Sequence, residues 1–347
     1  MSPVRRPRFS TLGASCGAGL ALLWLTAGMS GYNAFLLSAV GCYTLGALSI
    51  LVLTGWAGQI SLAQTAFMGF GAFAVGVLGG VDEGGSARLP FAAALLLVPL
   101  VCAIVAVLVG LPAVRIRGIH LALLTLALAY ALDVLVFTQG NFTRIVEQLT
   151  VTRPAAFGVS MKSDRAYAYL IWTVVGFASF ALWAMSRSQF GRILRSVRDS
   201  EVASSIMGVN VTAVKLAAFA LAGALAGLGG ALYGGLVGNV YSVFRSFDVL
   251  HSLLLTGIVV VGGGLVNIRG AIVGGALYVY GPEWMGNHFS QLPPELGAGI
   301  GLIVVAFASG RGLSVLVSDA WSALVARIRP WLPTPRATSS VAEERTV

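Results

Sequence analysis

The stretch FGRILRSVRDSEVASSIMGVNVTAVKLAAF (residues 190–219) is the only long polar segment in the otherwise apolar second half of the chain. Arg192, Arg195 and Arg198 follow one another at steps of three, so they share one face of a helix. Asp199 comes next and makes the charge of this surface mixed. The spacing therefore predicts a helix with a solvated, charged face outside the membrane.

The same predicted helix continues with a modest apolar side. Val202 and Ile206 lie four residues apart on it. Gly208 and Asn210 predict a stop and a turn, and a new apolar run begins at Lys215. Two interpretations stay open: an ordinary basic loop on the cytoplasmic side, or a short docking helix for a partner protein.

The composition indicates a polytopic membrane protein. Of the 347 residues, 57% are hydrophobic and 10% are charged, more apolar surface than one water-soluble core can hide. A bilayer needs about 20 apolar residues per helix, and the runs lack the alternation typical of a β-barrel, so we expect an all-α protein with about ten spans. The expected spans are residues 12–29, 33–53, 61–78, 89–111, 119–137, 167–185, 215–237, 249–266, 268–280 and 295–308.

The distribution of positive charge predicts the topology. With the basic segment 1–10 in the cytoplasm, alternation of the spans places sixteen of the 22 Lys and Arg residues inside. Both termini and the segment 187–214 are then cytoplasmic, whereas the loop 138–166 faces an external partner. The net charge of +9 is dispersed over short loops, so nucleic acid is not an expected partner.

The end of the chain is expected to contact membrane lipid. Apolar and basic residues alternate around a helix in residues 312–332, as in helices that lie on a membrane surface. Residues 333–347 are polar, and we expect them to be disordered. The membrane domain itself is expected to span residues 11–311.

Glycine is frequent within the spans and has two predicted roles. Tight helix packing is predicted by glycines four residues apart, as at Gly223 and Gly227, Gly230 and Gly234, and Gly270 and Gly274. The adjacent Gly262, Gly263 and Gly264 instead predict a helix break, with residues 268–280 completing a bent or re-entrant pair.

A second interruption, residues 54–61, contains no charge, although an ordinary cytoplasmic loop usually does. Gly58 supplies a turn, and Gln59, Ser61 and Gln64 offer hydrogen bonds. Either a translocating solute or a neighbouring helix could receive those bonds, so both a solute pathway and simple interhelical bonding remain open.

No catalytic or metal site is predicted. The histidines are scattered and the cysteines lie inside apolar runs without ligand spacing: His120, His251, His288, Cys16, Cys42 and Cys102. No lysine follows a glycine, which excludes a phosphate-binding loop of the Gly-Lys type. We therefore expect no bound cofactor, and any ATPase that drives the protein must be another polypeptide.

Three ordered motifs give the chain a family resemblance. GWAGQISLAQTAFMGFGAFAV (residues 55–75) resembles the GxxGQxSLGHAAFxGxGAY signature of the LivM-type permease subunits of branched-chain amino acid ABC importers. RSVRDSEVASSIMGVNVTAVKLAAFALAGALAGLGGALYG (residues 195–234) is similar to the RAIRDxExAAxxxGxxVxxxKxxAFxxSAxxAGxAGALY stretch of that family, and VVVGGGLVNIRGAIVGGAL (residues 259–277) to its GGxGxxxGPxxGA stretch.

The resemblance implies a fold, partners and site residues. It implies two inverted halves of membrane helices, like the vitamin B12 importer permeases, in the bacterial inner membrane. The implied partners are two ATP-hydrolysing subunits, a second permease and an external solute-binding protein. Coupling to the ATPase is assigned to Arg195, Arg198, Asp199, Glu201, Ala203 and Gly208, and the solute pathway to Gly58, Gln59, Ser61, Gln64 and Gly262 to Gly264.

The sequence departs from the family pattern at several positions. Gln64 replaces a usual His, Ser204 replaces the second Ala of the coupling motif, and Ala271 replaces a Pro. The expected solutes are branched-chain or other hydrophobic amino acids. Urea, short amides or another small polar solute remain alternatives within the family, and a passive channel is the alternative outside it.

Overall fold

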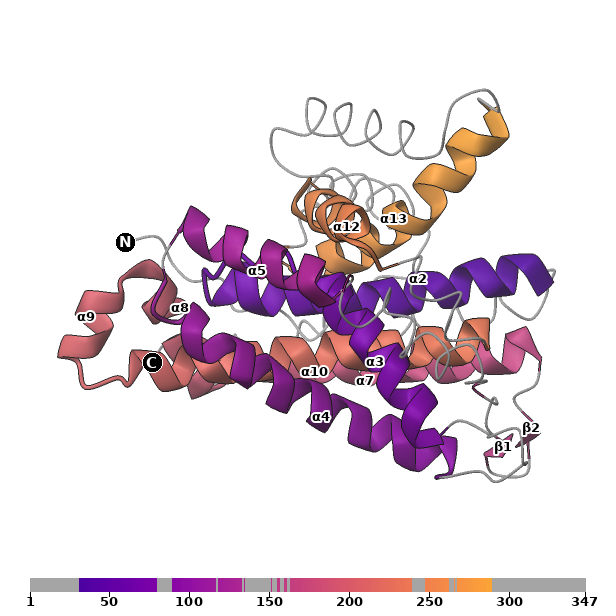
Figure 1. Cartoon of the computed structure of the whole chain (residues 1–347), viewed down its shortest axis with the longest axis horizontal. Coiled ribbons are helices and arrows are strands. Elements are labelled where there is room, and N and C mark those ends of the chain that lie inside the picture. The colour runs from indigo at the N-terminus through magenta and orange to yellow at the C-terminus, as the bar shows by residue number, and fades with distance from the viewer. Residues whose placement is uncertain are drawn as a thin grey trace, which may run out of the picture.

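The computed structural model describes residues 31–79, 89–116, 118–132, 134, 151, 155–156, 159–160, 163–238, 247–261, 265 and 267–288. Most of these residues form helices of a single bundle (Figure 1). The helices are α2 (Gly31–Ile50), which the π-helix η1 (Leu51–Trp56) continues, α3 (Gln64–Gly79), α4 (Phe91–Ala113), α5 (Ile119–Leu132), α7 (Asp164–Arg187), α8 (Gln189–Asp199), α9 (Glu201–Ile206), α10 (Val211–Val237), α12 (Val249–Val261) and α13 (Ile268–His288).

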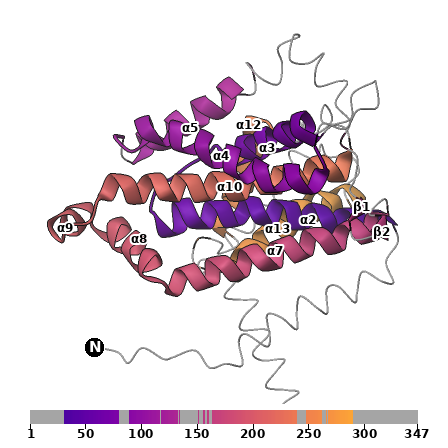
Figure 2. The ribbon, with the colours of Figure 1, turned by 90° about the horizontal axis from the view of Figure 1, so that it is seen from below.

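Helix α10 lies at the centre of the bundle, packed against α2, α3 and α4. Figure 2 shows α2 between α10 and α7, and both pairs are in contact. Glycines permit the close approach, as predicted for Gly223 to Gly234. A Cβ atom at Gly230 would overlap the Met68 carbonyl oxygen of α3, and one at Gly227 would overlap the Cys102 side chain of α4. The backbones of α3 and α10 therefore touch directly.

Four described helices are long and apolar enough to cross a membrane: Gly31–Trp56, Phe91–Ala113, Asp164–Arg187 and Val211–Val237. Their burial differs sharply. The most apolar window of the first is 100% buried inside the bundle, whereas that of α4 is only 22% buried. Leu96 and Phe177 are 80% and 73% exposed on α4 and α7, as lipid-facing side chains would be. The chain is thus a polytopic membrane protein with α2 in its interior.

The polar segment and the predicted outer loop lie at opposite ends of the bundle. Helices α8 and α9 project from one end, and the short hairpin of β1 (Ala155–Ala156) and β2 (Val159–Ser160) lies at the other (Figure 1). Each strand has only two residues, and the other described elements are helices, as the all-α prediction requires. Near it, the Val151 amide donates to the Gly238 carbonyl at 3.0 Å, just beyond the end of α10.

The predicted spans compare well with the helices, with one clear exception. Spans 33–53, 61–78, 89–111, 167–185 and 215–237 match α2, α3, α4, α7 and α10 within a few residues at each end. The prediction that span 268–280 is short is wrong, because α13 continues through Pro282 to His288. The continuation is held by the Tyr32 hydroxyl of α2, which donates to Glu283 Oε1 at 2.5 Å.

Several predictions concern residues outside the described ranges. These are the basic segment 1–10, the spans 12–29 and 295–308, the surface helix 312–332, the tail 333–347 and the glycines 262–264. On either side of those glycines, α12 ends at Val261 and α13 begins at Ile268.

The glycine contact predicts the effect of a single methyl group. Gly230→Ala should destabilise the protein by about 1–3 kcal/mol, because the new Cβ meets a backbone oxygen that no side-chain rotation can move. The measurement is thermal unfolding in detergent, followed by tryptophan fluorescence.

Gly176→Ala on α7 is the matched control, since no described atom lies within 4 Å of the added Cβ. This variant should equal the wild type or exceed it slightly, because alanine favours a helix over glycine. A Gly230→Ala protein that melts at or above the wild-type temperature would refute the direct backbone contact.

Candidate functional site

Helix α8 is fixed to the end of α7 by a sharp corner. Ser188 caps α8 by accepting from the Gly191 amide at 3.4 Å, and a Cβ at Gly191 would overlap the Met185 carbonyl oxygen. Arg192 and Arg195 donate to the carbonyls of Arg187 and Ser186 at 3.2 and 2.6 Å. Cationic groups stabilise the carbonyl end of a helix, so these two arginines hold α8 against α7.

Arg198 extends the same face to a distant part of the chain. Its Nη1 donates to the Gly55 carbonyl at 2.8 Å, while Nη2 pairs with Asp199 Oδ1 at 3.0 Å. Its stem lies on Gly58, where an added Cβ would come within 2.6 Å of Arg198 Cγ. Gly58 has φ +68°, a conformation that favours glycine. The arginine therefore joins the polar segment to the turn after η1.

The predicted continuous helix is in fact broken at Ser200. Its backbone is extended, with φ −159° and ψ 110°, and its hydroxyl accepts from the Ala203 amide at 3.2 Å, so Ser200 caps a new helix. The reason is local, because Ser200 is both the residue after the end of α8 and the N-cap of α9. As predicted, Gly208 ends the segment with φ +82°, and Asn210 caps α10.

Helix α9 exposes apolar side chains beyond the end of the bundle. Val202, Ile206 and Met207 are 64%, 81% and 83% exposed, whereas Ser204 is buried on the opposite side. Ala203 is also exposed. We call Val202, Ile206 and Met207 the α9 apolar face.

A buried ion pair connects α9 to the central helix, and the sequence did not predict it. Lys215 Nζ donates to Glu201 Oε1 at 2.6 Å, and the side chains are 2% and 25% exposed. The sequence contained an indication of this ion pair, because Lys215 is the only charged residue of α10 and a buried lysine needs a carboxylate partner.

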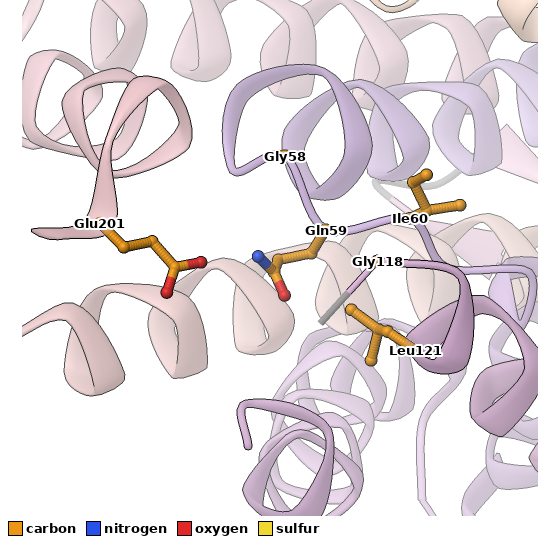
Figure 3. Close-up of a pocket in the computed structure, with 6 residues that line it drawn as sticks. All are labelled: Gly58, Gln59, Ile60, Gly118, Leu121 and Glu201. Atoms are coloured by element: carbon orange, nitrogen blue, oxygen red, sulfur yellow. The ribbon is translucent and has the colours of Figure 1, made fainter. Parts of the chain in front are cut away.

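Glu201 and Gln59 face one another across a small pocket (Figure 3). The pocket has a volume of about 110 Å³, and its lining residues come from three separate segments: Gly58, Gln59, Ile60, Gly118, Leu121 and Glu201. Gln59 is itself 7% exposed. The structure thus brings residues that were assigned to the solute pathway, Gly58 and Gln59, against residues that were assigned to coupling.

The other two residues of the signature turn inward, away from this pocket. The Ser49 hydroxyl of α2 donates to Gln64 Oε1 at 2.9 Å, and Gln64 Nε2 donates to the Ser61 hydroxyl at 3.4 Å. Ser61 and Gln64 are 1% exposed. Gln64 thus bonds α3 to α2, as in the interhelical role left open above, and Ser61 supports the Gln64 amide. Among the described residues, no three His, Cys, Asp or Glu side chains are grouped to hold a metal ion.

Curated relatives are bacterial import permeases. The LivM protein of the high-affinity branched-chain amino acid transport system is 27% identical in Salmonella typhimurium and 26% in Escherichia coli K12, over 72% of this chain and 63% of each relative. The chain thus spans less than two thirds of those relatives. The fructose import permease FrcC of Rhizobium meliloti is 29% identical over 35% of both chains. No solved structure gives a significant match.

The family model described as branched-chain amino acid transport system / permease component matches residues 32–309, which include every helix named above except the first residue of α2. Because this match covers most of the chain, the protein belongs to the family of branched-chain amino acid transport system permease components.

Proposed function

We propose that this chain is the permease subunit of an ABC importer that moves branched-chain or related hydrophobic amino acids across the bacterial inner membrane. Support for the solute comes from the LivM relatives, whose system is named for those amino acids. Support for ATP-driven transport comes from the α9 apolar face, which is exposed at a bundle end although α9 is tied to the core by Lys215.

A separate ATPase subunit docks on the α9 apolar face in this proposal. Three large apolar side chains from one short segment leave water when a groove of the partner covers them. Hydrogen bonds to backbone carbonyls hold α8 in position, and they come from Arg192, Arg195 and Arg198. Helices α8 and α9 are therefore fixed to the bundle, so a force that the ATPase applies to α9 is transmitted to the membrane helices.

Two polar links transmit that force. The Glu201–Lys215 pair leads to α10, and the Arg198–Gly55 bond leads to η1 and α2. When ATP closes the ATPase dimer, the partner favours one position of α8 and α9, and the attached helices shift between outward-open and inward-open arrangements. The work comes from the different affinity of the partner for the two states.

The rest of the proposed assembly follows the family. Two ATPase subunits use the ATP, this chain binds no cofactor, and a second permease completes the membrane domain. Ten helices in two inverted halves, like those of vitamin B12 importers, place both termini and α9 in the cytoplasm. An external solute-binding protein then meets the hairpin end of the bundle.

Uptake by the complete complex tests the function. In proteoliposomes that contain the permease pair, the ATPase subunits and the binding protein of the same genome, radiolabelled leucine should accumulate only with ATP. Accumulation that persists without ATP would indicate a passive channel. A panel with isoleucine, valine and urea distinguishes the amino acids from small polar solutes.

A charge on the α9 apolar face tests the docking site. Ile206→Asp should weaken co-purification of the ATPase subunits roughly thirtyfold, because a carboxylate would be buried at the centre of the contact. Ile206 is 81% exposed, so folding should be unaffected.

Thr212→Asp provides the control, because Thr212 is also exposed nearby but lies in the first turn of α10. An aspartate there is favourable to the helix. The docking site is refuted if Ile206→Asp retains the ATPase as well as Thr212→Asp does.

The ion pair predicts an asymmetry between two deletions. Glu201→Ala should destabilise the protein by about 3–5 kcal/mol, because it leaves the Lys215 ammonium buried and unpaired. Lys215→Met should cost less, since the remaining carboxylate is 25% exposed. The double variant should recover much of the loss, measured by thermal unfolding in detergent.

A Lys215→Met protein that is less stable than Glu201→Ala would contradict this order. A measurement of uptake distinguishes the role of the Glu201–Lys215 pair in transmitting force from its role in stability. The double variant should fold yet transport poorly, because the link from α9 to α10 is gone.

A further inference from the structure

Several buried hydroxyl groups in the described helices have no hydrogen-bond partner. They belong to Thr44, Thr65, Ser179, Thr256 and Tyr278. Hydroxyls in helices usually avoid this state by donating to a carbonyl one turn earlier. Ser38 and Thr125 do so here, to Ala34 and Ala122 at 2.7 and 3.0 Å. The unpartnered Thr44 therefore differs from Ser38 of the same helix.

Three of these hydroxyls come from helices that pack together. Thr44 lies on α2, Thr256 on α12 and Tyr278 on α13, and they are 0%, 7% and 8% exposed. A Cβ at Gly275 of α13 would lie 2.7 Å from Thr44 Oγ1, and one at Gly274 would lie 3.1 Å from Val259 Cα of α12. We call Thr44, Thr256, Gly275 and Tyr278 the α2–α12–α13 seam.

An aromatic cluster adjoins the seam. The Tyr43 ring lies 4.5 Å from Tyr278 and 5.4 Å from Tyr233, and Phe247 is within 6.1 Å of Tyr43. Phe247 is 1% exposed and directly precedes Asp248, whose carboxylate pairs with His251 at 2.6 Å. Aromatic rings thus pack beside the seam, and a carboxylate in contact with a histidine lies next to Phe247 in the chain.

An unpartnered hydroxyl in a membrane interior is unfavourable, because neither water nor lipid satisfies it. Burial of three such groups between glycine-lined helices is understandable if another conformation or a solute satisfies them. The seam itself has no charged side chain. Its hydroxyls can donate to a carboxylate or an amide oxygen, and the neighbouring ring faces attract an ammonium group.

We propose that the α2–α12–α13 seam is the closed part of the solute path and that it opens to bind a small solute of zero net charge, such as a zwitterionic amino acid. This inference rests on the proposed transport function. Thr44, Thr256 and Tyr278 contact the solute, and the Tyr43 cluster closes the path beside them. Gln64, held by Ser61, bonds α3 to α2 beside this path.

Removal of the unpartnered hydroxyls tests the seam. Thr44→Val and Thr256→Val should leave thermal stability unchanged or raise it, because no bond is lost. Tyr278→Phe should change it little, because the Tyr278 hydroxyl interacts with Tyr43 without the geometry of a full hydrogen bond. Each should raise the KM for leucine uptake by the reconstituted complex about tenfold, since a bond to the bound solute is lost. Thr173→Val is the control, because that exposed hydroxyl is bonded to Tyr169 on α7.

Thiol labelling in the same complex supplies a second measurement. In a background where Cys16, Cys42 and Cys102 are alanine, Thr44→Cys and Thr256→Cys should react with a maleimide much faster during ATP turnover than at rest. Ser38→Cys, also buried on α2 but bonded along its own helix, should not.

The outcomes separate this inference from the proposed function. The seam would not be part of the solute path if all three hydroxyl variants had the wild-type KM, or if Thr44→Cys were labelled no faster than Ser38→Cys. Either result would leave ATP-driven leucine uptake, and so the proposed function, intact. Failure of the wild-type complex to transport any solute of the panel would overturn the proposed function instead. The labelling comparison, which needs only ATP turnover, would then decide whether the seam opens.

Discussion

Apolar helices in lipid gain little by hiding apolar surface from a solvent that is itself apolar, so contact between backbones must hold them together. This constraint explains why α10, with glycines facing α3 and α4, lies at the centre of the bundle. Gly230 meets Met68, Gly227 meets Cys102 and Gly223 meets Ala106. Contacts this close allow few intermediate positions. Rigid helices joined in this way move as bodies, which a rocking transporter needs.

Polar contacts have a different distribution and a different role. At the end of the bundle where α8 and α9 project, Arg195 and Arg198 donate to helix-end carbonyls, and Lys215 pairs with Glu201. Inside the bundle, the Tyr167 hydroxyl of α7 donates to the Leu232 carbonyl of α10 at 2.9 Å. Directed bonds therefore supplement the glycine contacts, both inside the bundle and at the end where α8 and α9 project. Directed bonds can transmit a pull as well as a push.

The sequence predicted most of the helices but less of the site. Five spans were correct within a few residues, because the length of an apolar run depends on bilayer thickness alone. Gly208 as a stop was also correct, since a positive φ is a local requirement. The break at Ser200 was missed because a serine is compatible with both a helix and a cap. The continuation of α13 past Pro282 was missed because proline usually ends a helix, and beyond it Glu283 accepts from Tyr32, 251 residues away in the chain.

The meeting of Gln59 with Glu201 shows why residue roles were harder to predict than helices. The family signature assigned one residue to the pathway and the other to coupling, and the fold places both on one pocket. Helix α2 explains how the two roles connect. It contains Thr44 of the seam, then Ser49 bonded to Gln64, and continues as the π-helix η1 to Gly55, which Arg198 contacts. Short π-helical segments within helices frequently mark functional sites. Motion of α8 therefore has a route to Thr44 of the seam, through the Arg198–Gly55 hydrogen bond to η1 and then along the buried length of α2.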